Sequence, residues 1–188
     1  MKKKLCLALS GALCLSAGVG CGTETAEETL TPVRLNEVVH SVFYAPQYVA
    51  QELGFFEEEG LDVSVAVGNG ADKSMTALLS DSADIALLGT EAGLYVYAEG
   101  KADYPKTFAQ LTQRAGNFLV SREDEPDFQW SDLERKSVIG GRLGGMPEMV
   151  LEYVIKENGM TIGKDMEIIN NIDFTSTAGA FLGEVGDY

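Results

Sequence analysis

The chain has 188 residues, 45% of them hydrophobic, which is enough for one or two domains with a core and argues against wholesale disorder. Its 14 basic and 29 acidic side chains give a formal net charge of −15, which excludes nucleic acid as a partner because phosphate binding draws on clustered Lys and Arg. Its three cysteines are too few for a disulfide framework.

The N-terminus has the pattern of an export signal. Lysines at positions 2–4 are followed by an uncharged, apolar stretch over residues 5–19, which is short for a membrane span. The sequence Gly-Val-Gly-Cys at 18–21 resembles a lipobox, in which Cys21 is lipidated and becomes the new N-terminus. An ordinary secretory signal is the alternative, since Gly18 stands where a lipobox usually has Leu.

Lipidation at Cys21 would place the protein on a membrane surface. We expect a lipoprotein signal peptide over residues 1–20 and a flexible, acidic tether over 21–32. The lipid would anchor the protein to the cell membrane on its extracytoplasmic face, in the periplasm or at the cell surface.

Short apolar runs alternate with helical patterns from residue 33 onward, which predicts an α/β fold with a mainly parallel sheet. Residues 61–67 alternate apolar and polar side chains, as an edge strand does. Residues 83–88 are almost continuously apolar, as is typical of a central strand covered on both faces. Further strands are expected at 33–39, 107–112, 118–121, 138–140 and 166–170.

Helical spacing of apolar residues predicts helices between these strands. Two of them begin at prolines, Pro46 and Pro147, and end before glycines, Gly54 and Gly159. Another helix contains Met75, Leu78 and Leu79, and the last is expected at 175–182. Asp187 and Tyr188 then look like the start of a further strand, so the fold is expected to be incomplete at this end.

Residues 45–63 closely resemble the N-terminal signature of solute-binding proteins of ABC importers, in the SsuA/THI5-like (NMT1-like) family. In that signature a helix ends in Glu-x-Gly-x-Phe and Gly-Leu-x-Val opens a strand. The corresponding residues here are Glu52, Gly54, Phe56, Gly60, Leu61 and Val63. The blocks at 77–89, 108–121 and 137–149 are also similar to the family, so the resemblance covers nearly all of the chain after residue 33.

The resemblance implies a periplasmic-binding-protein fold of the second type, with two lobes and mainly parallel sheets. The first lobe would span residues 33–111, a hinge crossover 112–117, and the second lobe 118–188. Family members complete the second lobe and return to the first. Because this sequence ends before that return, the second lobe is expected to be incomplete.

The resemblance also implies a function. The protein would capture a small solute, either a sulfonate, nitrate or taurine-like anion or a thiamine-precursor pyrimidine, and deliver it to an ABC permease and its ATPase. Enzymes of the same fold in pyrimidine or menaquinone synthesis are the alternative, and a ligand-sensing lobe is a third possibility. The pyrimidine synthases use a cysteine-rich motif, whereas no cysteine follows Cys21, and the menaquinone enzymes lack an export signal. We therefore expect a binding protein without a cofactor, not an enzyme.

Ligands of parallel α/β sheets lie at the carboxyl ends of strands, where helix N-termini point their N–H groups outward. The loops after the predicted strands supply the candidate ligand-binding residues. They are His40, Phe43, Tyr44, Asn69, Gly70, Thr90, Glu91, Arg142, Gly144, Gly145, Met146, Asp173, Thr175 and Ser176.

Several candidates have a structural explanation as well. Phe43 fits a core as well as an aromatic pocket wall. The sequence Gly-Asn-Gly at 68–70 is also an ordinary turn. Glu91 also complements a helix dipole, and the hydroxyl groups at 175–177 are good helix caps.

The loop 140–147 carries four glycines around Arg142 and opens a helix, which suits an anion or a carbonyl. Arg142 could pair with a sulfonate or carboxylate, or bridge acidic neighbours, and the sequence leaves both open. Arg142 favours an anionic ligand, whereas Tyr44 and Tyr95 favour a pyrimidine-like ring. His40 is the only histidine and no EF-hand spacing is present, so no metal site is expected.

Overall fold

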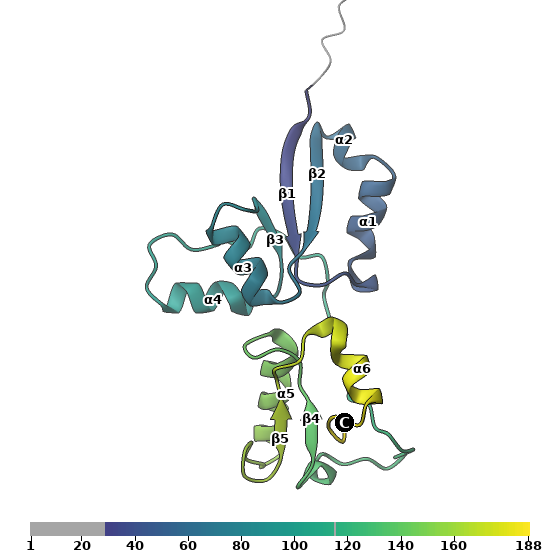
Figure 1. Ribbon diagram of the computed structural model, residues 1–188. Coiled ribbons are helices and arrows are strands. Elements are labelled where there is room, and N and C mark those ends of the chain that lie inside the picture. The colour runs from purple at the N-terminus through teal and green to yellow at the C-terminus, as the bar shows by residue number, and fades with distance from the viewer. Residues whose placement is uncertain (1–28, 115) are drawn as a thin grey trace, which may run out of the picture.

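The computed structural model describes residues 29–114 and 116–188, which form two α/β parts along the chain (Figure 1). We refer to residues 31–98 as the N-terminal part and to residues 130–188 as the C-terminal part. The expected signal peptide, the lipidation site at Cys21 and most of the expected tether lie outside the described residues. No helix within the described ranges has the length and apolarity to cross a membrane.

The N-terminal part is built on a three-stranded parallel sheet. Its strands are β1 (Thr31–Glu37), β2 (Leu61–Val67) and β3 (Ile85–Leu87), in the order β2-β1-β3. Strand β1 begins two residues before the expected position and pairs Thr31 with Leu61, so Thr31 and Pro32 belong to the sheet and not to the tether. The parallel strands and the exact bounds of β2 confirm the prediction.

The expected position of residues 83–88 in the sheet is wrong. Among the described residues β3 pairs only with β1, and β1 is the central strand. The apolar run does not reveal this order, because apolarity reports burial and not the number of neighbouring strands. Helix α3 packs against β3 and β1 and provides that burial.

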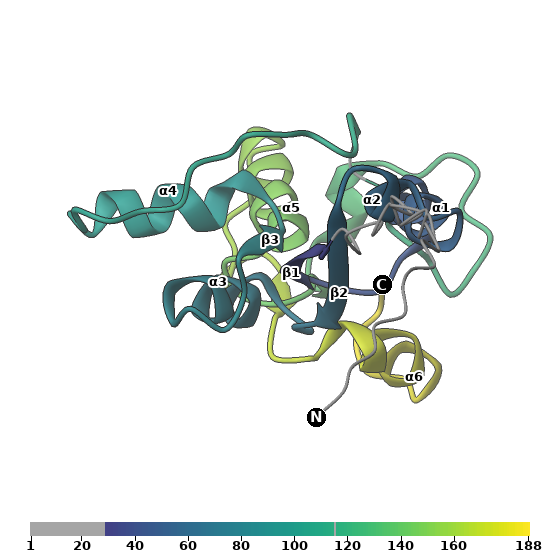
Figure 2. The same ribbon diagram turned by 90° about the horizontal axis from the view of Figure 1, so that it is seen from above.

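Helices cover the sheet from two sides (Figures 1 and 2). Helices α1 and α2 lie toward β2, and α3 and α4 lie toward β3. Pro46 stands in the first turn of α1, and Gly54 follows the helix with φ of 75°, as the sequence predicts. The N-terminal part contains the 3-10 helix η1 (Val42–Tyr44), α1 (Ala45–Glu52), α2 (Phe55–Glu58), α3 (Ala71–Leu79) and α4 (Thr90–Ala98).

The C-terminal part carries a second parallel pair of strands, β4 (Ser137–Ile139) and β5 (Glu167–Ile169). Asp187 and Tyr188 lie beside β4, where Asp187 N donates to Ser137 O over 2.7 Å and Tyr188 O accepts from Ile139 N over 2.9 Å. The remaining elements are η2 (Trp130–Leu133), α5 (Met146–Glu157), η3 (Phe174–Ser176) and α6 (Thr177–Leu182).

Three expectations for this half of the chain are wrong. Residues 107–112 and 118–121 form no strands, because no strand among the described residues lies beside them to take up their backbone hydrogen bonds. Their aromatic side chains are accordingly exposed, Phe108 by 77% and Phe118 by 82%. The last helix is shorter than expected, because residues 174–176 form a 3-10 turn and α6 begins only at Thr177.

Each part has its own apolar core. In the C-terminal part Leu133, Val138 and Ile155 are almost completely buried, and Trp130 packs against them. In the N-terminal part the cluster is smaller and centres on Met75 and Ala92. The cluster of the C-terminal part is therefore the larger of the two apolar cores.

Replacing Leu133 with alanine should lower the free energy of unfolding by about 2–5 kcal/mol, because it removes a fully buried side chain and leaves a cavity. Urea denaturation would measure the change. The matched control is Leu182→Ala, since Leu182 is 82% exposed and its loss should be nearly neutral. Equal effects of the two substitutions would contradict this description of the core.

Candidate functional site

A cavity of about 780 Å³ lies between the two parts, at the carboxyl ends of β1, β3 and β4. Both parts contribute to its walls, together with the segment 107–117 that joins them. Half of the residues predicted from the sequence line it. These are Phe43, Tyr44, Thr90, Glu91, Arg142, Gly145 and Met146.

The other predicted residues do not line this cavity. They are His40, Asn69, Gly70, Gly144, Asp173, Thr175 and Ser176. Asn69 and Gly70 form a turn with positive φ, and the Gly70 N–H donates to Val38 O within the fold. Gly144 donates its N–H to the buried Glu148 carboxylate over 3.1 Å. All of these ligand-binding assignments remain predictions.

The sequence prediction missed the joining segment, which supplies Gln110, Gln113, Arg114 and Asn117 to the cavity. In the structure these polar side chains follow no strand, although the strand expected at 107–112 would have put Gln113 and Arg114 at a strand end. The expected hinge at 112–117 is a further signal that could have found Gln113, Arg114 and Asn117, because a hinge borders the space between two lobes.

A buried carboxylate fixes the loop after β1. Glu37 is fully buried and accepts hydrogen bonds from Tyr48 Oη over 2.8 Å and from Gln47 Nε2 over 3.2 Å. Its other oxygen lies 2.9 Å from His40 Nδ1, and the His40 ring stacks on Tyr48 with centroids 4.4 Å apart. His40 is thus a structural partner of Glu37, which explains why it does not face the cavity.

Arg142 joins the two parts by ion pairs. Its Nη2 lies 2.7 Å from Asp72 Oδ2 on α3, and its Nη1 lies 2.5 Å from Asp173 Oδ1. Lys73 also approaches Asp173, at 3.8 Å. Burial alone would raise the pKa of Asp72, but the hydrogen bonds and charge of Arg142 outweigh it and lower that pKa. Of the two interpretations of Arg142, the structure shows the bridge between acidic neighbours.

Glu91 lies where two helix N-termini meet. It is the second residue of α4 and is only 4% exposed. Burial raises its pKa. Hydrogen bonds from the backbone amides of Glu91 itself and of Met146, the first residue of α5, lower the pKa by less than burial raises it. Among the described residues its Oε2 has no hydrogen-bond partner. The carboxylate folds back over the Cα of Gly89, where a side chain would collide with it.

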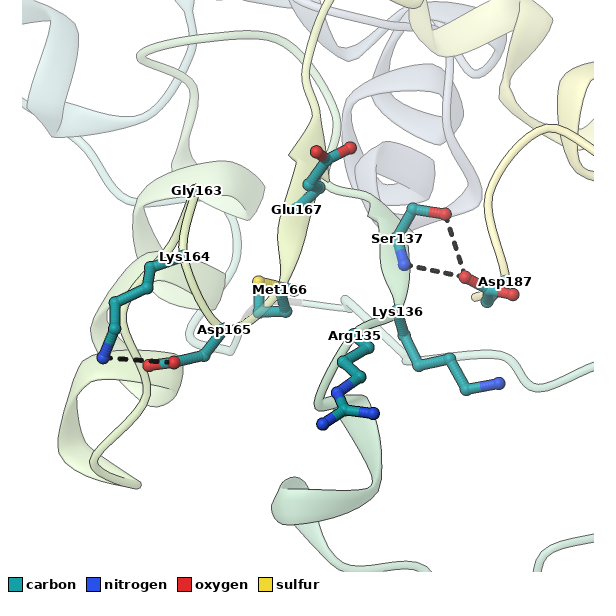
Figure 3. Close-up of a pocket in the computed structure, with 9 residues that line it drawn as sticks. All are labelled: Arg135, Lys136, Ser137, Gly163, Lys164, Asp165, Met166, Glu167 and Asp187. Carbon is teal, nitrogen blue, oxygen red and sulfur yellow. Dashed lines mark hydrogen bonds and ion pairs between the residues drawn. The ribbon is translucent and has the colours of Figure 1, made fainter.

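A second pocket, of about 430 Å³, lies at the other end of the C-terminal sheet (Figure 3). Asp187 there accepts hydrogen bonds from Ser137 N over 2.8 Å and from Ser137 Oγ over 3.0 Å, and these bonds lower its pKa. Lys164 pairs with Asp165 at 3.5 Å. None of the predicted site residues lines this pocket. Within the described ranges no group of three His, Cys, Asp or Glu residues is placed to hold a metal ion.

The fold and the cavity between its two parts are those of a two-lobed α/β binding protein, and comparison with known proteins gives the family. The pattern of the NMT1/THI5-like family matches residues 42–185, and the chain belongs to this family. YtlA of Bacillus subtilis (strain 168), which is described as a binding protein, is 53% identical over 162 residues, which are 86% of this chain and 48% of YtlA.

Solved structures confirm the fold. The periplasmic aliphatic sulphonate-binding protein SsuA of Escherichia coli matches with a TM-score of 0.56 and 14% identity, over 84% of this chain and 52% of SsuA. The alkanesulfonate-binding protein SsuA of Xanthomonas axonopodis pv. citri, bound to MOPS, matches with a TM-score of 0.53 and 17% identity, over 84% and 53%. The chain spans about half the length of these relatives.

Replacing Arg142 with glutamine should loosen the connection between the two parts. Partly exposed ion pairs contribute little to stability, so the free energy of unfolding should fall by no more than about 1 kcal/mol. The distance between spin labels on α3 and α5 should nevertheless become more broadly distributed, because both bridges to Arg142 are lost. Double electron–electron resonance would measure this distance distribution. The spin labels would be attached at Leu79→Cys and Tyr153→Cys, both at exposed positions, after replacement of the native cysteines by serine.

The matched control for this experiment is Arg34→Gln. Arg34 pairs with Asp84 at 2.7 Å inside the N-terminal part, so its loss should leave the distribution between the labels unchanged. An unchanged distribution in the Arg142 variant would show that the ion pairs do not hold the two parts together.

The raised pKa of Glu91 predicts how stability depends on pH. The folded protein binds the proton at this site more tightly than the unfolded chain, so the charged form costs stability at pH 7 and this cost disappears below about pH 4. Glu91→Gln should therefore raise the Tm at pH 7 and leave it unchanged near pH 4. Circular dichroism would follow the unfolding, with exposed Glu99→Gln, at the end of the same helix, as the control. A lower Tm for the Glu91 variant at pH 7 would contradict the prediction.

Proposed function

We propose that this protein is the solute-binding component of an ABC importer. It captures a small solute in the cavity between its two parts, which act as lobes that close on the ligand, and it delivers the solute to a permease and its ATPase. The observation that carries this proposal is the cavity of about 780 Å³ at the carboxyl ends of strands from both parts.

The comparisons support this proposal. The family match covers most of the described residues, the curated relative YtlA is described as a binding protein, and the structural relatives named SsuA bind sulfonates. Their names favour binding over catalysis, and we propose on this basis that the protein is not an enzyme. The chain spans about half the length of these relatives, so the capture and delivery of a solute by the whole protein are proposed.

The proposed location is the extracytoplasmic face of the cell membrane. The basic start at residues 2–4, the apolar stretch and the lipobox-like sequence before Cys21 support an exported lipoprotein. The family supports the same side of the membrane, since the E. coli SsuA is a periplasmic protein. A lipid on Cys21 would keep the cavity close to the permease.

The solute is proposed to be a sulfonate, nitrate or taurine-like anion or a pyrimidine. Phe43 and Tyr44 give the cavity an aromatic wall, which suits a flat ring. Arg114 also lines the cavity and carries a positive charge that suits an anionic group. Arg142 supports an anionic solute less directly, because it already pairs with Asp72 and Asp173.

A ligand of this protein should raise its Tm. Binding at a hundred times the Kd adds about 2.7 kcal/mol to the free energy of unfolding. Thermal unfolding with a panel of alkanesulfonates, nitrate, taurine and pyrimidines would find the ligand class, and calorimetry would give its Kd. Tyr44→Ala should weaken binding at least about tenfold, the scale of one lost contact of about 1.4 kcal/mol.

The matched control is Tyr153→Ala, since Tyr153 is 63% exposed on α5 and does not line the cavity. If no compound of the panel raises the Tm, the proposed solute classes are wrong. If a compound binds and Tyr44→Ala binds it as tightly as the control does, the cavity is not the site.

A further inference from the structure

We infer that Glu91 is the recognition residue of the cavity and that the solute carries a nitrogen group with N–H donors, an amine or an amidine, which binds to the Glu91 carboxylate. The inference rests on the proposed function and adds the chemistry of the ligand. It is carried by the position of Glu91 in the cavity wall and by its Oε2, which has no hydrogen-bond partner among the described residues.

Glu91 is built into the wall of the cavity and is more than nine-tenths buried. A buried carboxylate normally accepts several hydrogen bonds, as Glu37 does from Tyr48 and Gln47. Glu91 Oε2 accepts none from the described residues, and a buried carboxylate oxygen without a hydrogen bond is costly. A partner that enters the cavity with N–H donors would remove this cost.

Arg142 does not supply a counter-charge for Glu91, because its guanidinium group is already paired. Arg142 lines the same cavity, but two of its nitrogens donate hydrogen bonds to Asp72, at 2.7 and 3.2 Å, and the third donates to Asp173. The other charged groups in the lining are Asp72 itself and Arg114. Glu91 forms no ion pair with either arginine among the described residues, so its charge is left for the solute to match.

The same position argues against an anion at this point of the cavity. The N-termini of α4 and α5 are the places where the backbone would attract an anion, and the Glu91 carboxylate already lies between them. An anionic group of the solute would have to lie elsewhere, toward Arg114. The cavity thus suits a molecule with an amino group at one end and a ring or an acidic group at the other.

Tyr44 and Thr90 complete the surroundings of Glu91. Thr90 is its neighbour at the start of α4 and also lines the cavity. Tyr44 lines the same cavity, and burial raises its pKa, with the charges of Glu37 and Glu91 adding to that shift. An aromatic ring and a carboxylate in one cavity form a suitable site for a protonated amine or a flat amidine.

The experiment uses compounds in matched pairs that differ only in the amino group. The pairs are 2-aminoethanesulfonate with ethanesulfonate, 3-aminopropanesulfonate with propanesulfonate, and 4-aminopyrimidine with pyrimidine. Thermal unfolding and calorimetry on the purified wild-type protein and its variants would give the Kd of each compound. The wild-type protein should bind the amino member of at least one pair at least tenfold more tightly than its partner.

Two variants test the role of Glu91 in different ways. Glu91→Gln removes the charge at constant size, and Gly89→Ala keeps the charge but displaces the carboxylate, because the new Cβ would collide with it. Gly89 has φ of −67°, so alanine fits its backbone. Both variants should lose the preference for the amino compounds, whereas exposed Glu99→Gln should keep it.

The outcomes separate this inference from the proposed function. If compounds bind but the amino group makes no difference, or if both variants keep the preference, the inference is overturned and the solute-binding function stands. If no member of any pair binds, sulfonates, taurine-like anions and pyrimidines are excluded as solutes, and the inference fails with them. Loss of the preference in Glu91→Gln or in Gly89→Ala, with Glu99→Gln unchanged, supports it.

Discussion

The cavity of this protein depends on how Arg142 connects the two parts of the chain. Its guanidinium group bridges Asp72 on α3 and Asp173 before α6, so one side chain sets the spacing between the two sheets. Tyr95 adds a second connection, since its hydroxyl donates to Met149 Sδ on α5 over 3.0 Å. These contacts hold helices α4 and α5 with their N-termini toward each other, and the space beside them is the proposed binding site.

Acidic side chains have different roles around this cavity because their partners differ. Glu37 is satisfied by Tyr48 and Gln47 and shapes the loop that carries Tyr44. Asp72 is satisfied by Arg142 and links the two parts. Glu91 alone among these three has a buried oxygen without a partner in the described part of the chain, which is why the ligand chemistry is inferred from it. A buried oxygen without a partner, in a residue of the cavity wall, distinguishes Glu91 from Glu37 and Asp72.

Much of the fold could be predicted from the sequence, because local signals determine it. The alternation over residues 61–67 and the prolines and glycines that bound α1 and α5 gave elements close to those observed. The order of the strands and the irregular course of 107–121 could not be predicted, since they depend on which neighbours each segment finds. In the site, strand ends pointed to Tyr44 and Glu91, and both residues line the cavity. The pairing of Arg142 with Asp72, which lies 70 residues away in the sequence, could not be read from the loop alone.

The most direct test of the account is a crystal structure of the protein with the solute that stabilises it most. The account predicts that the solute lies between the N-terminal and C-terminal parts and contacts both, with its nitrogen group within hydrogen-bond distance of Glu91. A solute that contacts only one part, or that lies in the second pocket near Ser137 and Asp187, would contradict the account.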